Sequence, residues 1–417
     1  MNLRLFAAVA FLPVSAGAQS PLNLAFVGGQ WFDGRTFRAA TMYSQGGVFR
    51  RHRPAKVDST VDLHGTFVVP PFGEAHNHNV EFFGAARAQA IIAKYLLDGV
   101  FYVQNPLTIP RARDQMRPYV NRPRSVDVTF AVGGLTGSGG HPTGLFLRNL
   151  KAGVFTPADS DGGLLWVIDS LGDLDRKWNR ILANRPDFIK TFLLYSEEFE
   201  KRRNDSAYFN WRGLNPALLP EIVRRTHAAG LRVMCHIESA GDFHNAVAAG
   251  VDQIVHMPGF RGDEQGRMLS AERYAIQEQD AVAAARKGIV VVTTLQSGSA
   301  MIAARDGVEG KRFDSLQRAN LRTLVRHHVT IVIGTDNYRD TSVPEARYLH
   351  ELGVFSNVAL LRMWAETTAR AIFPRRRIGR LVDGYEASFL TLEANPLDNF
   401  ANTSRIALRV KQGVILP

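Results

Sequence analysis

Short apolar runs recur through the middle of the sequence and alternate with amphipathic segments of helical periodicity, such as 218–229 and 316–327. Runs of this kind followed by helical segments are typical of strand–helix–strand units around a parallel sheet. Eight runs qualify as strands: the run that ends before His76, then 101–103, 126–132, 188–194, 231–235, 251–255, 289–293 and 329–333. Eight such units predict an α/β fold, a (β/α)8 TIM-like barrel over residues 70–383.

The two ends of the sequence have a different pattern. Residues 23–69 contain short apolar pieces separated by glycines and polar turns, as in a group of short strands. Similar pieces return at 387–392, 406–410 and 413–415. We therefore expect residues 19–69 and 384–417 to form one small β-sandwich domain together.

The first residues have the pattern of a secretory signal peptide. Arg4 precedes an apolar stretch at 5–14, and Ala16-Gly17-Ala18 has the small-x-small form of a cleavage site. The apolar stretch is too short to span a bilayer, and no other segment is long enough. We expect residues 1–18 to be removed and the protein to be exported, periplasmic or extracellular, without an integral membrane segment. An uncleaved N-terminal anchor is the alternative.

Charge and cysteine content limit the kinds of site and partner. The formal net charge is +11, but the basic residues are spread along the chain with no nucleic-acid motif beside them. We expect no nucleic-acid partner and interpret these residues as solvated surface, with association to an anionic envelope as the alternative. Cys235 is the only cysteine, so a metal site must use histidine, carboxylate or a modified side chain.

Polar residues stand at or just after several of the predicted strands. The active site of a (β/α)8 barrel lies at the C-terminal ends of its strands, so these residues are expected to meet. Side chains alternate along a strand, which places the two histidines of the His-x-His pair on one side, and imidazole is a good zinc ligand. The residues at these positions are His76, His78, Lys190, His236, His256 and Asp336.

This ordered set resembles the amidohydrolase superfamily. The pattern is His-x-His after the first strand, lysine on the fourth, histidine after the fifth and sixth, and aspartate after the eighth, and no position is substituted here. Residues 135–141, which end in Gly139-Gly140-His141, are similar to the Gly-Gly-His loop of the imidazolonepropionase-like and metal-dependent dipeptidase-like branch.

The resemblance implies two divalent metal ions, usually Zn²⁺. His76, His78 and Asp336 would hold one ion, His236 and His256 the other, and Lys190, carboxylated by carbon dioxide, would bridge them with a hydroxide. A lysine among apolar residues loses its charge readily, and the free amine can add carbon dioxide to give an anionic carbamate. Manganese, iron or cobalt fit the same ligands.

Three residues are expected to act on the substrate. Asp336 would be the catalytic proton shuttle, taking the proton of the attacking hydroxide to the leaving atom. His141 is expected to face the substrate from its glycine-rich loop. Tyr195, close after the run that carries Lys190, is expected to shape the substrate-binding pocket.

These features predict a metal-dependent hydrolase that acts on carbon–nitrogen, amide-type bonds of a small molecule. An N-acyl amino acid, a dipeptide or a cyclic amide fits the branch that the sequence resembles. Two alternatives stay open: a lactonase or phosphotriesterase that uses the same site, and a non-catalytic exported protein that binds an anionic polymer. The sequence does not determine the oligomeric state, and a homo-oligomer stays open as well.

Overall fold

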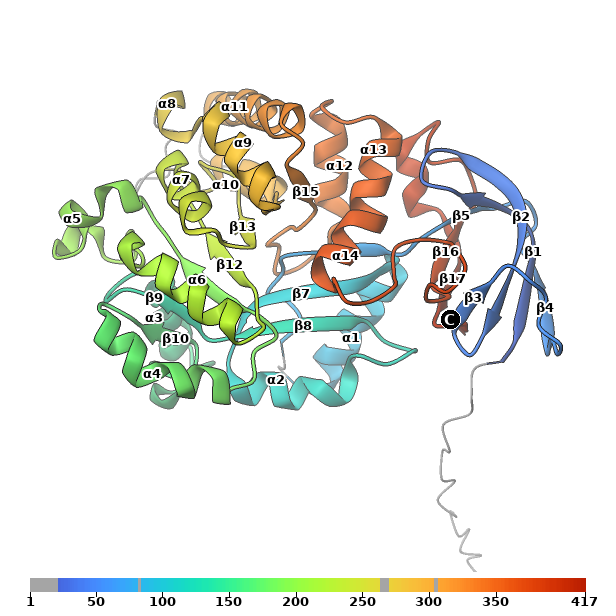
Figure 1. The fold of residues 1–417 in the computed structure, drawn as a ribbon, viewed down its shortest axis with the longest axis horizontal. Helices are drawn as coiled ribbons and strands as arrows, with labels where there is room; N and C mark the ends of the chain where they lie inside the picture. The colour runs from blue at the N-terminus through green and yellow to red at the C-terminus, as the bar shows by residue number, and fades with distance from the viewer. Residues whose placement is uncertain (1–21, 82–83, 263–269, 304–306) are drawn as a thin grey trace, which may run out of the picture.

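The computed structural model describes residues 22–81, 84–262, 270–303 and 307–417 (Figure 1). The predicted signal peptide, residues 1–18, lies outside the described residues. Within them, no helix is both long and apolar enough to cross a membrane.

Two parallel sheets form the larger part of the molecule. The first has three strands, β6 (Phe72–Glu74), β7 (Val100–Thr108) and β8 (Asp127–Val132), in that order. The second has seven strands in the order β10–β9–β11–β12–β13–β14–β15. Their bounds are β9 (Gly134–Thr136), β10 (Leu165–Val167), β11 (Ile189–Phe192), β12 (Val233–His236), β13 (Gln253–Val255), β14 (Val290–Val292) and β15 (Thr330–Val332). Every predicted run therefore contains a strand, whereas β9 and β10 were not predicted.

Backbone hydrogen bonds join the two parallel sheets at both edges of the three-stranded sheet. The Asp187 amide donates to the Phe130 carbonyl at 2.9 Å, and the Ala75 amide donates to the Ile333 carbonyl at 2.8 Å. The structure confirms a mixed α/β fold with parallel strands. Closure of all these strands into one eight-stranded barrel stays a prediction, because the strand ladders themselves form two sheets.

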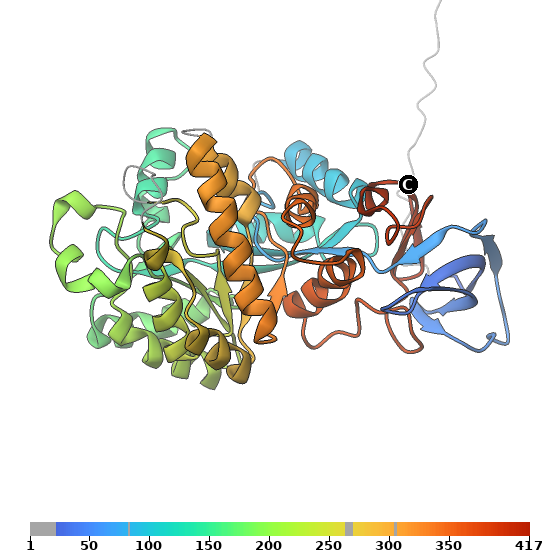
Figure 2. The same cartoon turned by 90° about the horizontal axis from the view of Figure 1, so that it is seen from above.

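Helices follow most of the parallel strands, and Figure 2 shows the long helix α11 (orange) alongside them. The predicted helical segment 218–229 corresponds to α6, and 316–327 overlaps α11. The bounds are α1 (Ala85–Leu97), α2 (Pro110–Met116), α3 (Thr143–Lys151), α4 (Leu171–Ala183), α5 (Phe199–Arg202), α6 (Leu219–Ala228), α7 (Ala240–Ala249), α8 (Ala271–Tyr274), α9 (Glu278–Lys287), α10 (Leu295–Ala303), α11 (Gly307–Arg326), α12 (Val343–Glu351), α13 (Asn357–Arg362) and α14 (Thr368–Ile372).

The two ends of the described chain meet in a separate, mostly antiparallel sheet (blue and red at the right of Figure 1). Its order is β18–β17–β16–β5–β1–β2–β3, and β4 pairs with β1. The strands are β1 (Leu24–Phe32), β2 (Phe37–Gln45), β3 (Val48–Arg50), β4 (Ser59–Asp62), β5 (Phe67–Val69), β16 (Phe389–Leu392), β17 (Ile406–Lys411) and β18 (Val414–Leu416). The expected contribution of both ends is therefore confirmed, while the domain boundaries at 69 and 384 stay predictions.

The end sheet curls around an aromatic core. Phe389 of β16 packs against Phe26 of β1 with ring centroids 4.8 Å apart, and against Phe49 of β3 at 6.0 Å. Because β5, β1 and β2 lie between β16 and β3, these two strands can share a ring contact only if the sheet bends over itself. The sandwich predicted from the sequence is thus one curled sheet of eight strands.

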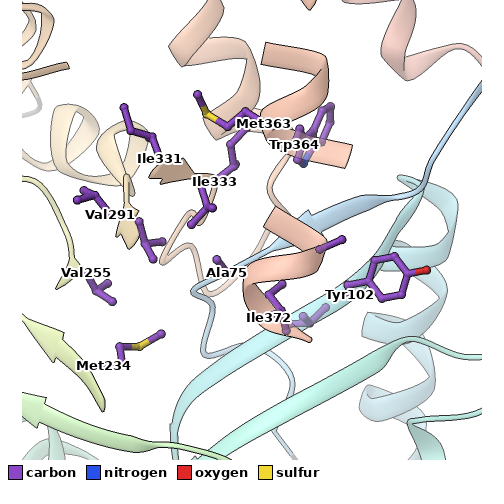
Figure 3. Packing of buried hydrophobic residues seen from close by; sticks show 14 of the residues in the cluster. Ala75, Tyr102, Met234, Val255, Val291, Ile331, Ile333, Met363, Trp364 and Ile372 are labelled. Carbon is purple, nitrogen blue, oxygen red and sulfur yellow. The ribbon is translucent and has the colours of Figure 1, made fainter. Parts of the chain in front are cut away.

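The parallel strands pack against the helical segment near the C-terminus. Figure 3 shows Val255, Val291 and Ile331 from neighbouring strands, with Trp364 and Ile372 from the segment 363–372 across the core. Trp364 also stacks on Phe72 of β6, with ring centroids 3.7 Å apart and planes 6° apart. This packing holds β6 beside β15, and so brings the two ends of the predicted ring of strands together.

Candidate metal centre

Neighbouring parallel strands carry the predicted ligand residues to one region of the molecule. His236 is the last residue of β12, His256 directly follows β13, and Lys190 lies within β11. The register aligns Phe192 of β11 with His236, and His236 with Val255. Since the C-terminal ends of parallel strands lie at one edge, these side chains meet there.

The side chains from β6 and β15 reach the same place. Nε2 of His76 lies 3.6 Å from Oδ1 of Asp336, and Nε2 of His78 lies 3.5 Å from the same oxygen. His76, His256 and Asp336 offer ligand atoms that all lie within 4.8 Å of one another. The rings of His236 and His256 have centroids 4.5 Å apart. The structure therefore brings the predicted histidines and Asp336 together, with Lys190 in the same cavity wall.

Four buried polar atoms in this cluster have no hydrogen-bond partner within the described chain: Nδ1 of His76, Nζ of Lys190, Nε2 of His236 and Oδ1 of Asp336. Leaving a buried donor or acceptor unsatisfied costs about 1–3 kcal/mol, so such groups are rarely left without a partner. Imidazole nitrogen and carboxylate oxygen are ligands of divalent cations. The residues present therefore fit a metal site.

Burial sets the protonation states of the histidines. It lowers the pKa of His76, His236 and His256 well below the ordinary value, and lowers the pKa of His78 to about 3. The positive charge of Lys190 acts in the same direction. These rings are neutral near pH 7, and neutral imidazole is the form that binds a cation.

Burial also changes the two other ionisable members of the cluster. Lys190 is 1% exposed, and burial lowers its pKa to about 7, while Asp336 opposes this shift. A substantial fraction of Lys190 is therefore the uncharged amine at neutral pH, which is the form that can add carbon dioxide. Burial raises the pKa of Asp336 to about 7, and the charges of Lys190 and Arg261 oppose that shift.

The chain is similar to several solved structures of hydrolases. These include Aspergillus niger ochratoxinase (TM-score 0.73, 16% identity, 95% of this chain and 96% of that chain) and an amidohydrolase (TM-score 0.70, 19% identity, 94% and 98%). A Xaa-Pro dipeptidase with bound methionine aligns with a TM-score of 0.68 at 15% identity, over 94% and 99%. The chain has the amidohydrolase fold. No family model and no curated protein matches the sequence.

Within this amidohydrolase fold, Glu74 links the strands that carry His76 and Asp336. It is fully buried, and its carboxyl group accepts hydrogen bonds from the Thr335 amide at 2.9 Å and the Thr335 hydroxyl at 2.7 Å. The His76 amide lies 3.3 Å from the same carboxyl group. Glu74 lies two residues before His76, in the first predicted strand. Nothing in the sequence indicated that it would contact Thr335, which lies 261 positions further on.

The cluster opens into a cavity of about 460 Å³. His141 lines it as predicted, with its ring centroid 4.8 Å from that of His236. Arg148, Arg261 and Arg339 also line the cavity, and sequence analysis did not single out Arg148 or Arg261. Tyr338, from the loop after β15, stacks on His78 with ring centroids 5.4 Å apart.

The structure does not bring Tyr195 to the cavity. Its side chain is fully buried, its hydroxyl donates to the Gly262 carbonyl at 2.6 Å, and the Tyr274 hydroxyl lies 3.1 Å away. The guanidinium of Arg202 lies over its ring, 4.3 Å from the centroid. Tyr195 thus supports the wall behind the site, and its predicted substrate contact has no support in this arrangement.

Proposed function

We propose that this protein is a metal-dependent hydrolase that cleaves an amide-type carbon–nitrogen bond of a small molecule. The observation that carries the proposal is the convergence of four unpartnered buried atoms, on His76, Lys190, His236 and Asp336, at one end of the parallel strands. Solved structures of the same fold include a prolidase, a Xaa-Pro dipeptidase and a phenylurea hydrolase, whose names denote carbon–nitrogen hydrolysis. N-acyl amino acids, dipeptides and cyclic amides are the proposed substrates.

The ligand set would hold two divalent cations, for which we propose Zn²⁺ because the set is rich in imidazole. His76, His78 and Asp336 would hold one ion and His236 and His256 the other, with Lys190 as a carbamate between them. Divalent ions at this place would polarise a substrate carbonyl and make a bound water acidic enough to attack near neutral pH.

Asp336 is proposed to move the proton. Its carboxylate lies beside His76 and His78 at the cluster, where it can accept a proton from the attacking water and return it to the leaving nitrogen. Protonation of the nitrogen lets the carbon–nitrogen bond break with a neutral amine as the product.

His141 is proposed to face the substrate carbonyl as a neutral hydrogen-bond donor. Burial lowers the pKa of His141 well below its ordinary value, and the charge of Arg261 adds to this shift. Nη1 of Arg261 lies 3.3 Å from Nδ1 of His141, and a guanidinium can only donate. Nδ1 of His141 is therefore the acceptor, and the ring carries its hydrogen on Nε2.

A substrate panel tests the proposed reaction. Metal-loaded protein is assayed on matched dipeptides, N-acyl amino acids, cyclic amides, lactones and phosphotriesters. Turnover of at least one amide class is expected. Turnover of lactones or phosphotriesters alone would replace the amide assignment with the esterase alternative, and no turnover at all would favour the non-catalytic alternative.

We also propose that the two parallel sheets form a (β/α)8 barrel. The Ala75–Ile333 and Asp187–Phe130 hydrogen bonds support this, since they join the three-stranded sheet to the other sheet at both of its edges.

Export is proposed from the signal-peptide pattern of residues 1–18. N-terminal sequencing of the protein secreted from an expression host is expected to give Gln19 as the first residue. A first residue of Met1 on exported protein would instead indicate an uncleaved anchor.

A further inference from the structure

Arg261 is held rigidly in the wall of the active-site cavity. Its backbone amide donates to Oε1 of Glu238 at 2.6 Å, and its Nε donates to Oε2 of the same carboxylate at 3.3 Å. Nη1 donates to Nδ1 of His141, and the guanidinium lies over the Trp211 ring, 4.8 Å from its centroid. These contacts fix both the position and the plane of the guanidinium.

One nitrogen of this guanidinium, Nη2, has no partner among the described residues. The Arg261 side chain is 19% exposed, and its Nη2 is buried with no hydrogen-bond partner in the part of the chain that the structure describes. A guanidinium stays charged at all ordinary pH values and cannot accept a hydrogen bond, so its N–H groups can be satisfied only by an acceptor. Arg261 lines the cavity, so water or a group of the substrate there can supply that acceptor.

The charge of the cavity favours an anionic acceptor. Arg148 and Arg339 also line it, and neither side chain has an ion-pair partner among the described residues. Asp336 is the one carboxylate among the described lining residues, and it belongs to the ligand cluster. Hydrogen bonds from a charged guanidinium to an ionised carboxylate are shorter and stronger than those to a neutral carbonyl.

We propose that Nη2 of Arg261 binds a carboxylate of the substrate, which makes the substrates N-acyl amino acids or dipeptides rather than neutral amides. The inference rests on the proposed amide hydrolysis. His141 contacts both Arg261 and the ligand cluster, since its Nδ1 lies 3.3 Å from Nη1 of Arg261 and its ring centroid lies 4.8 Å from that of His236. In an N-acyl amino acid or a dipeptide, one carbon separates the carboxylate from the nitrogen of the scissile amide, so the carboxylate must bind close to the cluster. A carboxylate at Arg261 meets this requirement.

The rival interpretation is that Arg261 only positions His141. Loss of a positioning residue would lower hydrolysis of all amides by the same factor. Loss of a carboxylate-binding residue would lower hydrolysis of carboxylate-bearing amides selectively. The ratio of kcat/KM for a matched charged and neutral pair distinguishes the two roles.

The kinetic test uses N-acetyl-L-phenylalanine and N-acetyl-L-phenylalanine amide, with release of acetate as the common measurement. The unaltered metal-loaded enzyme is expected to prefer the carboxylate. Arg261→Gln is expected to lower kcat/KM for the carboxylate about tenfold more than for the amide, and Arg261→Lys to have a smaller selective effect. Equal losses for both compounds, or a preference of the unaltered enzyme for the neutral one, would overturn the proposal.

Arg176→Gln is the matched control, because Arg176 is 70% exposed on α4 and does not line the cavity. Its ratio of the two kcat/KM values is expected to equal that of the unaltered enzyme. Thermal melting and metal content show whether each variant is folded and loaded.

A binding measurement separates this inference from the proposed reaction. Calorimetry of the metal-loaded protein compares 4-phenylbutanoate with 4-phenylbutanol, neither of which contains an amide. We expect Arg261→Gln to weaken binding of the acid about tenfold and to weaken binding of the alcohol much less. If this difference appears in a protein that hydrolyses no amide, the carboxylate site stands and the proposed reaction fails. If Arg261→Gln binds the acid as tightly as the unaltered protein does, the carboxylate binds at another place and the assignment of its site to Arg261 is wrong.

Discussion

At the residue scale, burial determines the chemistry of the site. The same loss of water that makes the histidines neutral brings the pKa of Lys190 down to about 7 and that of Asp336 up to about 7. A lysine and an aspartate with matched values can both change protonation state near neutral pH. The site is therefore suited to carbamate formation at Lys190 and to proton transfer at Asp336.

Asp336→Asn is expected to lower kcat by a factor of about 10²–10⁴, because the amide cannot accept the proton that the reaction releases. Asp175→Asn is the control, since Asp175 is 63% exposed and pairs with Arg225 on the surface. Steady-state kinetics on the best amide substrate measure both variants. Full activity of Asp336→Asn with its metals bound would show that another group carries the proton.

Glu74→Ala is expected to reduce both stability and metal content. The change leaves the amide and hydroxyl of Thr335, the His76 amide and an Asn77 amide hydrogen without this acceptor in a buried place, at a cost of roughly 3 kcal/mol. Urea unfolding and elemental analysis measure the two effects. Glu74→Gln, which keeps one acceptor oxygen, is expected to lose less, and equal stability of all three proteins would contradict a linking role for Glu74.

At the element scale, capping and turn interactions set the loops that surround the parallel strands. Asp159 closes the turn Pro157–Asp159 by accepting hydrogen bonds from the amide and the hydroxyl of Thr156. It also accepts from Nε of Arg111 at 3.0 Å and from Nη2 at 2.8 Å. This carboxylate thus fastens the loop before β10 to α2.

The Arg111 contact, followed by the Thr156 bonds, lowers the pKa of Asp159 to about 2 from an ordinary value of 3.8. A carboxyl whose folded-state pKa is depressed stabilises the fold above its unfolded pKa, and this contribution is lost as the pH falls from about 4 to 2. Asp159→Asn is therefore expected to cost roughly 2 kcal/mol at pH 6, with the difference from the unaltered protein shrinking below pH 4. Urea unfolding of both proteins between pH 6 and pH 3 measures this difference in the free energy of unfolding. A difference that stays constant over the range would contradict the lowered pKa of Asp159.

The element scale also shows where sequence reasoning succeeds and where it fails. His76, His236 and His256 could be predicted because each ends or follows an apolar run, and strand ends meet by topology alone. Arg261 could not, since its contact with His141 spans 120 positions and depends on how two loops fold over the cavity. Tyr195 follows its strand about as closely as Asp336 follows β15, and both have a left-handed backbone, with φ at 47° and 52°. The Tyr195 side chain nevertheless ends in the core, where its hydroxyl donates to the Gly262 carbonyl, and the sequence does not indicate that contact.

Glycine conformation explains how the two strands that were not predicted, β9 and β10, arise. Gly133 has φ at 74°, so the chain turns at the end of the run 126–132 and continues as β9 in the other parallel sheet. The strand β10 then pairs with β9 through residues 165–167. A single glycine inside an apolar stretch does not indicate by itself which sheet the next residues will join.

At the scale of the whole molecule, buried charges tie the end sheet to the parallel strands. Nζ of Lys411, in β17, donates to the carbonyls of Arg122 and Ser125 at 2.7 and 2.6 Å, and to Oδ1 of Asp127 in β8 at 2.6 Å. Lys411 is 0% exposed. One lysine of the C-terminal strand therefore satisfies three acceptors of the larger body.

Lys411→Met is expected to lower the free energy of unfolding by about 3 kcal/mol, because it leaves the Arg122 and Ser125 carbonyls without this donor and leaves Asp127 paired with Arg376 alone among the described residues. The matched control is Arg405→Met, since Arg405 and Glu393 are 55% and 53% exposed and such surface pairs contribute at most about 1 kcal/mol. Urea unfolding of the two variants measures the difference. Equal costs would show that Lys411 does not hold the two parts together.

The central claim is that the buried cluster binds two divalent metal ions and that hydrolysis depends on them. Elemental analysis of the purified protein, with amide hydrolysis assayed before stripping, after stripping and after metal is returned, tests it most directly. We predict close to two ions per chain, loss of hydrolysis on stripping and its recovery on reconstitution. A protein that holds no metal tightly and gains no activity when metal is added would contradict the account.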